Sequence, residues 1–209
     1  MKEVKNTSDL VKMALFVAII ILLSVTPLGY IHLLSVINAT TIQIPVIIGA
    51  ILFGWKKGAF LGGVFGITSM IKNTVSPNVT SFVFSPFVPV EGTTKGSPLA
   101  IIVCLLPRIM IGVVAGLLFK VLSKTKLSKA ISSGICGFCG ALTNTILVMG
   151  GIYLFFGRSY SAAKDQAYET LIGTVMATIT GIGITEALVS AVISAAACVP
   201  LFKYMSKKD

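Results

Sequence analysis

The chain has 209 residues, of which 55% are hydrophobic and only 11% are charged. A soluble domain usually carries about 25% charged residues, so this composition excludes a water-covered globular surface and predicts an integral membrane protein. The formal net charge of +10 would suit a nucleic-acid-binding protein, but the positions of the cations indicate membrane topology instead, and no nucleic-acid partner is expected.

Six apolar segments are long enough, or nearly so, for membrane helices, which need roughly 20 mostly apolar residues. The second and third are short, and Pro45 lies in the first turn of the second, where its missing N–H costs least. The predicted fold class is therefore an all-α integral membrane protein, a six-transmembrane-helix bundle forming one domain over residues 1–209. The expected helices cover about 10–28, 41–55, 58–71, 99–122, 130–156 and 171–202.

Lysine and arginine are distributed unevenly over the connections between these helices. The side that collects most of them is expected to be cytoplasmic, so both termini are predicted to be cytoplasmic in a multi-pass protein of a bacterial plasma membrane. The first apolar run has no small-residue cleavage site after it and is interpreted as a retained helix. The longer connections, 29–40, 72–98 and 157–170, then face outward. Twelve of the 17 cations lie on the cytoplasmic side: Lys2, Lys5, Lys12, Lys56, Lys57, Lys120, Lys124, Lys126, Lys129, Lys203, Lys207 and Lys208.

Small residues recur at four-residue spacing, which lets helix backbones approach closely in lipid. In the third and fourth helices this pattern favours internal packing. The pair Ala14 and Ala18 in the first helix lies near the cytoplasmic end, where a partner protein could dock. The recurring glycines are Gly58, Gly62, Gly66, Gly112 and Gly116.

Three polar side chains within the spans are candidates for ligand binding, because polar groups are costly in the membrane. Arg108, Asn144 and Glu186 are expected to lie roughly 15–23 Å below the outer helix ends, and so could share one zone of the bundle. Arg108 offers a planar guanidinium to a carboxylate, and Asn144 offers a donor and an acceptor to hydroxyl or amide groups. The alternatives are an ion pair between Arg108 and Glu186, and for Asn144 a hydrogen bond between helices.

The segment KNTVSPNVTSFVFSPF, residues 72–87, is too irregular for a helix and too apolar for a plain linker. Irregular backbone at membrane depth is tolerated only where it is buried in protein or lines a cavity. We therefore expect a lid over an outward-facing pocket, with Phe82, Phe84 and Phe87 as its apolar cover and Asn73 and Asn78 as ligand contacts. A purely structural plug is the alternative.

No motif indicates catalysis, a metal site or a cofactor. The four cysteines lie in apolar runs and are interpreted as packing residues, and His32 stands alone in the first outward loop. The chain lacks a P-loop, a Rossmann glycine fingerprint, GxSxG and HExxH. It is therefore expected not to be an enzyme and to have no ATPase of its own. A membrane enzyme, for example one acting on lipid head groups, usually has clustered Asp, His or Ser near the interface, whereas Glu186 is the only acid expected within the spans. A self-sufficient secondary carrier would favour inverted repeats, and the two halves show no convincing repeat.

These features together resemble the substrate-binding S components of energy-coupling factor (ECF) vitamin transporters, over essentially the whole chain. The segments INATTIQIPVIIGAILFGWKKGAFLG (37–62), FGITSMIKNTVSPNVTSFVFSPF (65–87) and LLPRIMIG (105–112) are similar to the pantothenate-type branch. The resemblance implies a vitamin pocket in the outer halves of helices 4 to 6, capped by the loops after helices 1 and 3.

The resemblance also implies partners. An S component associates with a membrane scaffold subunit (EcfT) and two cytoplasmic ATPases, and it is thought to topple in the membrane when ATP is hydrolysed. The docking face for the scaffold maps onto Ala14 and Ala18. Pantothenate would offer a carboxylate to Arg108, and hydroxyl and amide groups to the three asparagines. Other vitamins, such as pyridoxine-like compounds, hydroxymethylpyrimidine, riboflavin or folate, are the alternatives.

Overall fold

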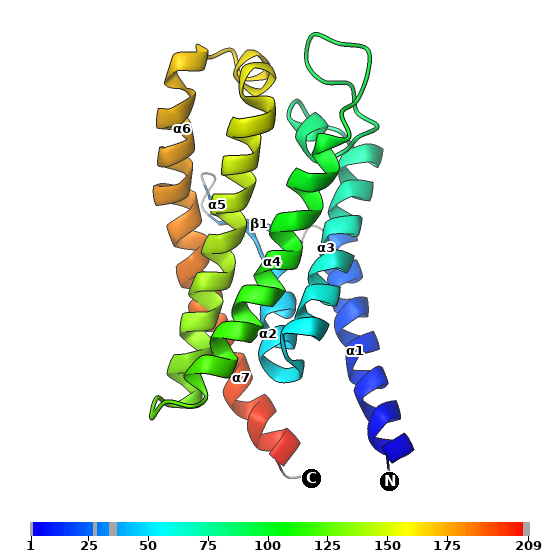
Figure 1. The fold of residues 1–209 in the computed structure, drawn as a ribbon, viewed down its shortest axis with the longest axis vertical. Coiled ribbons are helices and arrows are strands. Elements are labelled where there is room, and N and C mark those ends of the chain that lie inside the picture. Colours follow the sequence, from blue (N-terminus) through cyan, green and yellow to red (C-terminus); the bar gives the residue numbers. More distant parts are fainter. Residues whose placement is uncertain (1, 27–28, 34–36, 207–209) are drawn as a thin grey trace.

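A computed structural model describes residues 2–26, 29–33 and 37–206, and the side chains of 9–26, 29 and 41–204. Long helices stand side by side, and the N- and C-termini lie at the same end of the bundle (Figure 1). We call this the termini end, and the opposite end, with residues 76–98 and 164–167, the loop end. The elements are α1 (Lys2–Val25), β1 (Tyr30–Leu33), β2 (Ile37–Thr40), α2 (Gln43–Phe53), α3 (Trp55–Val75), the 3₁₀ turn η2 (Ser81–Val83), α4 (Leu99–Leu122), α5 (Lys129–Ala163), the 3₁₀ turn η3 (Tyr168–Thr170), α6 (Leu171–Thr178), the π-helical turn η4 (Ile179–Gly183) and α7 (Ile184–Ser206).

The predicted all-helical architecture with six helical segments is confirmed, since α6, η4 and α7 follow one another without a break. In the part of the chain that the structure describes, three stretches are long and apolar enough to cross a membrane: Leu99–Leu122, Lys129–Ala163 and Tyr168–Tyr204. The helix bounds differ from those expected: α1 begins at Lys2, and α5 extends to Ala163. The expected end of the first helix, 27–28, lies outside the described residues.

The first connection, expected to be a loop, contains a short antiparallel hairpin. Strands β1 and β2 pair with Tyr30 opposite Thr40 and Leu33 opposite Ile37. Apolar, β-branched and aromatic residues predominate in both strands, as β-structure favours. The prediction missed the hairpin because its strands are only four residues long, too short for an alternating pattern to stand out from an apolar background.

Helix α2 forms the centre of the bundle. Its residues Gln43–Ile51 are all buried, and it packs against α1, α3, α4, α5 and α7. An apolar helix surrounded by other helices needs no polar face, which explains why QIPVIIGAILF has almost none. Gly54, with a φ of 88°, ends α2 and lets the chain turn directly into α3. A side chain at this φ would be strained.

Glycines on α3 and α4 bring these two helices into close contact, which confirms the expected internal packing. A Cβ atom on Gly62 would collide with the backbone oxygen of Arg108, and one on Gly112 would collide with that of Gly58. Gly63, one residue along and facing away, has nothing within 4 Å of such an atom. The stripe of small residues thus fixes the position of Arg108 relative to α3.

Buried apolar side chains form two clusters, one toward each end of the bundle. The cluster nearer the termini end centres on α2, with Ile47, Leu61 and Ile111 among its members. The cluster nearer the loop end joins η2 to α4, α5 and α6, and includes Phe82, Val103 and Phe156.

Candidate functional site

Arg108 is held inside the bundle by a hydrogen bond that depends on the residue before it. Pro107 stands inside α4 and has no N–H, so the carbonyl oxygen of Val103, four residues earlier, lacks its usual helical donor. The Nη1 atom of Arg108 donates to that oxygen at 3.1 Å. Pro107 therefore leaves the Val103 oxygen without a helical donor, and the guanidinium of Arg108 donates to it instead. This hydrogen bond directs the Arg108 side chain toward the loop end.

Two aromatic rings flank the guanidinium. Its central carbon lies 4.9 Å from the ring centroid of Phe84, in the loop after η2, and 5.6 Å from that of Phe65 on α3. Cations are attracted to aromatic faces at such distances. Arg108 is only 8% exposed, so its charge is largely withdrawn from solvent. A planar cation fixed between rings is well placed to bind a carboxylate in two-pronged fashion.

The loop over Arg108 is tied to the end of α3 by side-chain hydrogen bonds. Ser81 Oγ donates to Asn73 Oδ1 at 2.8 Å and accepts from the backbone N–H of Asn78 at 2.9 Å. Thr74 and Ser85 share a hydrogen bond of 2.7 Å between their hydroxyls. Asn73 also donates from Nδ2 to the backbone oxygen of Ser69. The polar residues of this segment therefore hold its irregular backbone in one shape.

The aromatic residues of the loop differ in their environments. Phe82 is buried and its ring meets that of Phe156 edge-on at 5.9 Å. Phe84 lies over Arg108, as described above. Phe87 is 74% exposed, so the expectation that it packs over the site is wrong. Asn78 is exposed and uses Oδ1 to accept from the backbone N–H of Thr80, forming a local turn.

A second polar group lies on α2, α5 and α7. Asn144 on α5 and Glu186 on α7 are 9% and 8% exposed. Gln43, at the first position of α2, is 1% exposed and donates from Nε2 to Ser190 Oγ at 3.2 Å. Gln43 was not among the predicted site residues, although a glutamine at the start of an otherwise apolar helix is a signal of the same kind as Asn144.

Helix contacts fix the levels of these groups. A Cβ on Gly140 would lie 3.3 Å from Ile47 Cγ1, which fixes α5 against α2. The two helices run in opposite directions (Figure 1). Asn144 on α5 and Gln43 on α2 therefore each lie one helical turn from that contact, toward the loop end. A Cβ on Gly151 would lie 3.1 Å from Val103, whose oxygen binds Arg108. Seven residues of α5 separate Asn144 from Gly151, which is about 10 Å along the axis. Asn144 and Gln43 thus lie at about the same level of the bundle, and Arg108 lies about 10 Å nearer the loop end.

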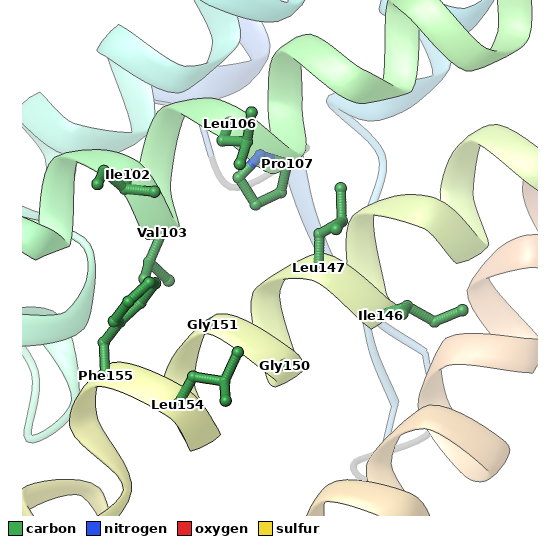
Figure 2. A pocket seen from close by; sticks show the side chains of 10 residues that line it. All are labelled: Ile102, Val103, Leu106, Pro107, Ile146, Leu147, Gly150, Gly151, Leu154 and Phe155. Atoms are coloured by element: carbon green, nitrogen blue, oxygen red, sulfur yellow. The ribbon is translucent and has the colours of Figure 1, made fainter.

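A groove of about 390 Å³ lies between α4 and α5 but has a different character (Figure 2). Apolar side chains of both helices line it, and Pro107 is among them. Several of these side chains are exposed on the outside of the bundle, including Ile102 and Leu154. No charged side chain lines the groove, so it is not suited to an anionic ligand. Its full lining is Ile102, Val103, Leu106, Pro107, Ile146, Leu147, Gly150, Gly151, Leu154 and Phe155.

The alanine pair of α1 faces away from the bundle. Ala14 and Ala18 are both exposed, as are the neighbouring apolar side chains Leu15 and Leu22. The other face of α1 packs against α3, and Ser24 there donates to Thr68 Oγ1 at 2.9 Å. The small residues of α1 therefore leave a flat apolar strip open to an approaching helix.

Comparisons with known proteins agree on one family. The model of the ECF transporter substrate-specific component matches residues 8–202. The chain is 34% identical over 197 residues to the pantothenic acid transporter PanT of Lactococcus lactis, covering 94% of each chain. It is 33% identical over 152 residues to the pantothenate transporter PanT of Leuconostoc mesenteroides, covering 69% of this chain and 67% of that protein. The chain therefore belongs to the family of substrate-specific components of ECF transporters.

Proposed function

We propose that this chain is the pantothenate-binding S component of an ECF-type importer. Two relatives over 30% identical are named for pantothenate transport, which favours this vitamin over the others of the family's range. The observation that carries the proposal is the buried guanidinium of Arg108, held between the rings of Phe65 and Phe84 beneath the loop. Pantothenate has one carboxylate, which a buried guanidinium can bind in two-pronged fashion.

Six membrane spans with both termini in the cytoplasm are part of the proposal. The two termini lie at one end of the bundle, together with the turn after α2 and the connection between α4 and α5 (Figure 1). That end contains the lysines Lys56, Lys57, Lys124 and Lys126, as the positive-inside rule requires. The loop end then faces outward, and the loop of 76–98 covers the outer mouth of the site.

Within this site the residues have separate roles. Arg108 binds the carboxylate, and Asn144 and Glu186 line the deeper part, where the hydroxyl and amide groups lie. Phe82 anchors the loop in the apolar cluster and Phe84 closes over the guanidinium. Asn73 and Asn78 hold the shape of the loop and do not contact the ligand themselves, because their side-chain oxygens already accept hydrogen bonds within the loop.

Transport requires partners, since the sequence has no nucleotide-binding motif. We assign energy coupling to a membrane scaffold subunit (EcfT) and two cytoplasmic ATPases, with Ala14 and Ala18 on the docking face. The exposed strip on α1 supports this assignment, because small residues let a partner helix approach closely.

Titration of the purified chain with a panel of vitamins tests the proposal. We expect one pantothenate per chain and no comparable binding of pyridoxine, riboflavin or folate. The Arg108→Ala variant should lose at least about 100-fold in affinity, because an ion pair withdrawn from water loses about 3 kcal/mol or more when one partner is removed. Arg158→Ala, which removes an exposed arginine at the loop end of α5, is the matched control and should bind normally. Unchanged binding by Arg108→Ala would overturn the carboxylate assignment.

A further inference from the structure

Two buried amide oxygens, on α2 and α5, have no hydrogen-bond donor in the described part of the chain. Oδ1 of Asn144 and Oε1 of Gln43 are both buried, and neither accepts a hydrogen bond within the described part of the chain. Buried polar atoms in proteins nearly always have partners, and leaving one unsatisfied costs about 1–3 kcal/mol. Two such acceptors on neighbouring helices are candidates for accepting hydrogen bonds from a ligand.

The geometry keeps Gln43 in place for such a role. Its Nε2 is engaged by Ser190 Oγ on α7 at 3.2 Å, so the amide is fixed by its donor end and presents its oxygen. Its Cα lies at the start of α2, one turn from the tight contact between Ile47 and Gly140. Asn144 lies one turn from the same contact on α5. The two oxygens thus approach one level of the bundle from α2 and α5.

The distance to Arg108 matches the ligand of the proposed function. Arg108 binds at the level of Val103, about 10 Å nearer the loop end than Asn144. Pantothenate has a carboxylate at one end of its chain, an amide in the middle and two hydroxyls at the other end. Its main chain has as many atoms as three residues of extended backbone, and so spans on the order of 10 Å. Its hydroxyls are the donors that the two oxygens lack.

We propose that Gln43 and Asn144 form a subsite for the hydroxyl-bearing end of pantothenate, with Ser190 as a positioning residue. The vitamin lies along the bundle axis, with its carboxylate on Arg108 near the mouth and its hydroxyls at the inner end. Gln43 is then a specificity-determining residue, because a site with unpaired acceptors rejects analogues that lack the matching donors. This inference rests on the proposed function.

Binding of two probes to matched variants tests the subsite. The probes are pantothenate and N-pivaloyl-β-alanine, which keeps the carboxylate and the amide but lacks both hydroxyls. Gln43→Met keeps the length of the side chain and removes its hydrogen bonding, and it should weaken pantothenate binding about 10- to 100-fold while leaving binding of the pivaloyl probe within about threefold. Asn144→Leu should show the same pattern from another helix. Thr68→Val removes an interior hydroxyl on α3, bonded to Ser24, and should change neither probe.

The outcomes separate this inference from the proposed function. If the unaltered chain does not bind pantothenate, the proposed function fails. The proposed subsite is contradicted if the unaltered chain binds pantothenate, Arg108→Ala loses this affinity, and Gln43→Met binds pantothenate as tightly as the unaltered chain. An equal loss of both probes in Gln43→Met and Asn144→Leu also contradicts the subsite, because it indicates a general disturbance of packing. Selective loss of pantothenate in either variant supports it.

Discussion

Replacing Pro107 by alanine should weaken vitamin binding while making the protein no less stable. The substitution restores a backbone N–H at position 107, and that N–H will donate to the Val103 oxygen that now accepts from Arg108. A proline inside a helix costs about 3 kcal/mol, so the restored hydrogen bond strengthens α4. The loss of the buried proline ring, which packs beside Val103 and Leu147 in the groove (Figure 2), offsets part of that gain.

The effect on binding follows from what Arg108 loses. A hydrogen bond to a charged group contributes about 1.5–3 kcal/mol, but a carbonyl oxygen has two lone pairs and can still accept weakly from the guanidinium. The rings of Phe65 and Phe84 also continue to hold it. We therefore expect the lower end of that range, about 1.5 kcal/mol, which is slightly more than a tenfold loss of affinity.

Calorimetric titration with pantothenate, together with thermal unfolding in detergent, measures both effects. Pro200→Ala is the matched control, because Pro200 also lies inside a helix, α7, but is exposed near the termini end. This control should gain stability without any change in affinity. The reasoning is refuted if Pro107→Ala binds pantothenate as tightly as the unaltered chain, or if Pro200→Ala loses the same affinity.

Three further predictions concern packing, docking and the loop. Gly62→Val should destabilise the chain and weaken binding, because a Cβ atom at this position collides with the Arg108 backbone. A Cβ atom at Gly63 has nothing within 4 Å, so Gly63→Val should change neither stability nor affinity. Thermal unfolding and titration measure these two effects. Replacing Ala14 and Ala18 by tryptophan should spare binding but abolish uptake by vesicles containing the scaffold and ATPases, and persistent uptake would contradict the docking assignment. Phe84→Ala should raise the pantothenate dissociation rate about tenfold, because a cation–π contact withdrawn from water contributes about 1–2 kcal/mol. Stopped-flow measurement of pantothenate release gives this rate, and an unchanged rate would indicate that the segment 72–87 is a structural plug and not a lid.

The sequence was sufficient to predict most of the architecture. Apolar length identified α4 at its observed bounds, Leu99–Leu122. The spacing of Gly58, Gly62 and Gly112 predicted internal packing, which the structure shows as a close contact between α3 and α4. The hairpin was not predicted because its four-residue strands are too short to show an alternating pattern. The π-helical turn η4 lies within the sixth apolar run, where no sequence pattern indicated it. Phe87 was misjudged for a similar reason: three aromatic residues in one irregular segment carry no periodicity that tells which of them faces inward.

The candidate site was only partly readable. Arg108, Asn144 and Glu186 stood out as costly polar groups in apolar helices, but the role of Pro107 depends on a hydrogen bond that only coordinates reveal. Gln43 was overlooked because it lies at the edge of its helix, where a polar residue can pass for an interfacial one. Its side chain is buried and is bonded to Ser190 on α7, a contact between elements far apart in the sequence.

The central claim is that the carboxylate of pantothenate binds Arg108, and comparison with pantothenol tests it most directly. Pantothenol differs from pantothenate only in carrying a hydroxymethyl group in place of the carboxylate. Equilibrium titration of the unaltered chain should show one pantothenate bound per chain and at least 100-fold weaker binding of pantothenol, and Arg108→Ala should reduce this preference to less than tenfold. Equal affinity of the unaltered chain for the two compounds would contradict the account.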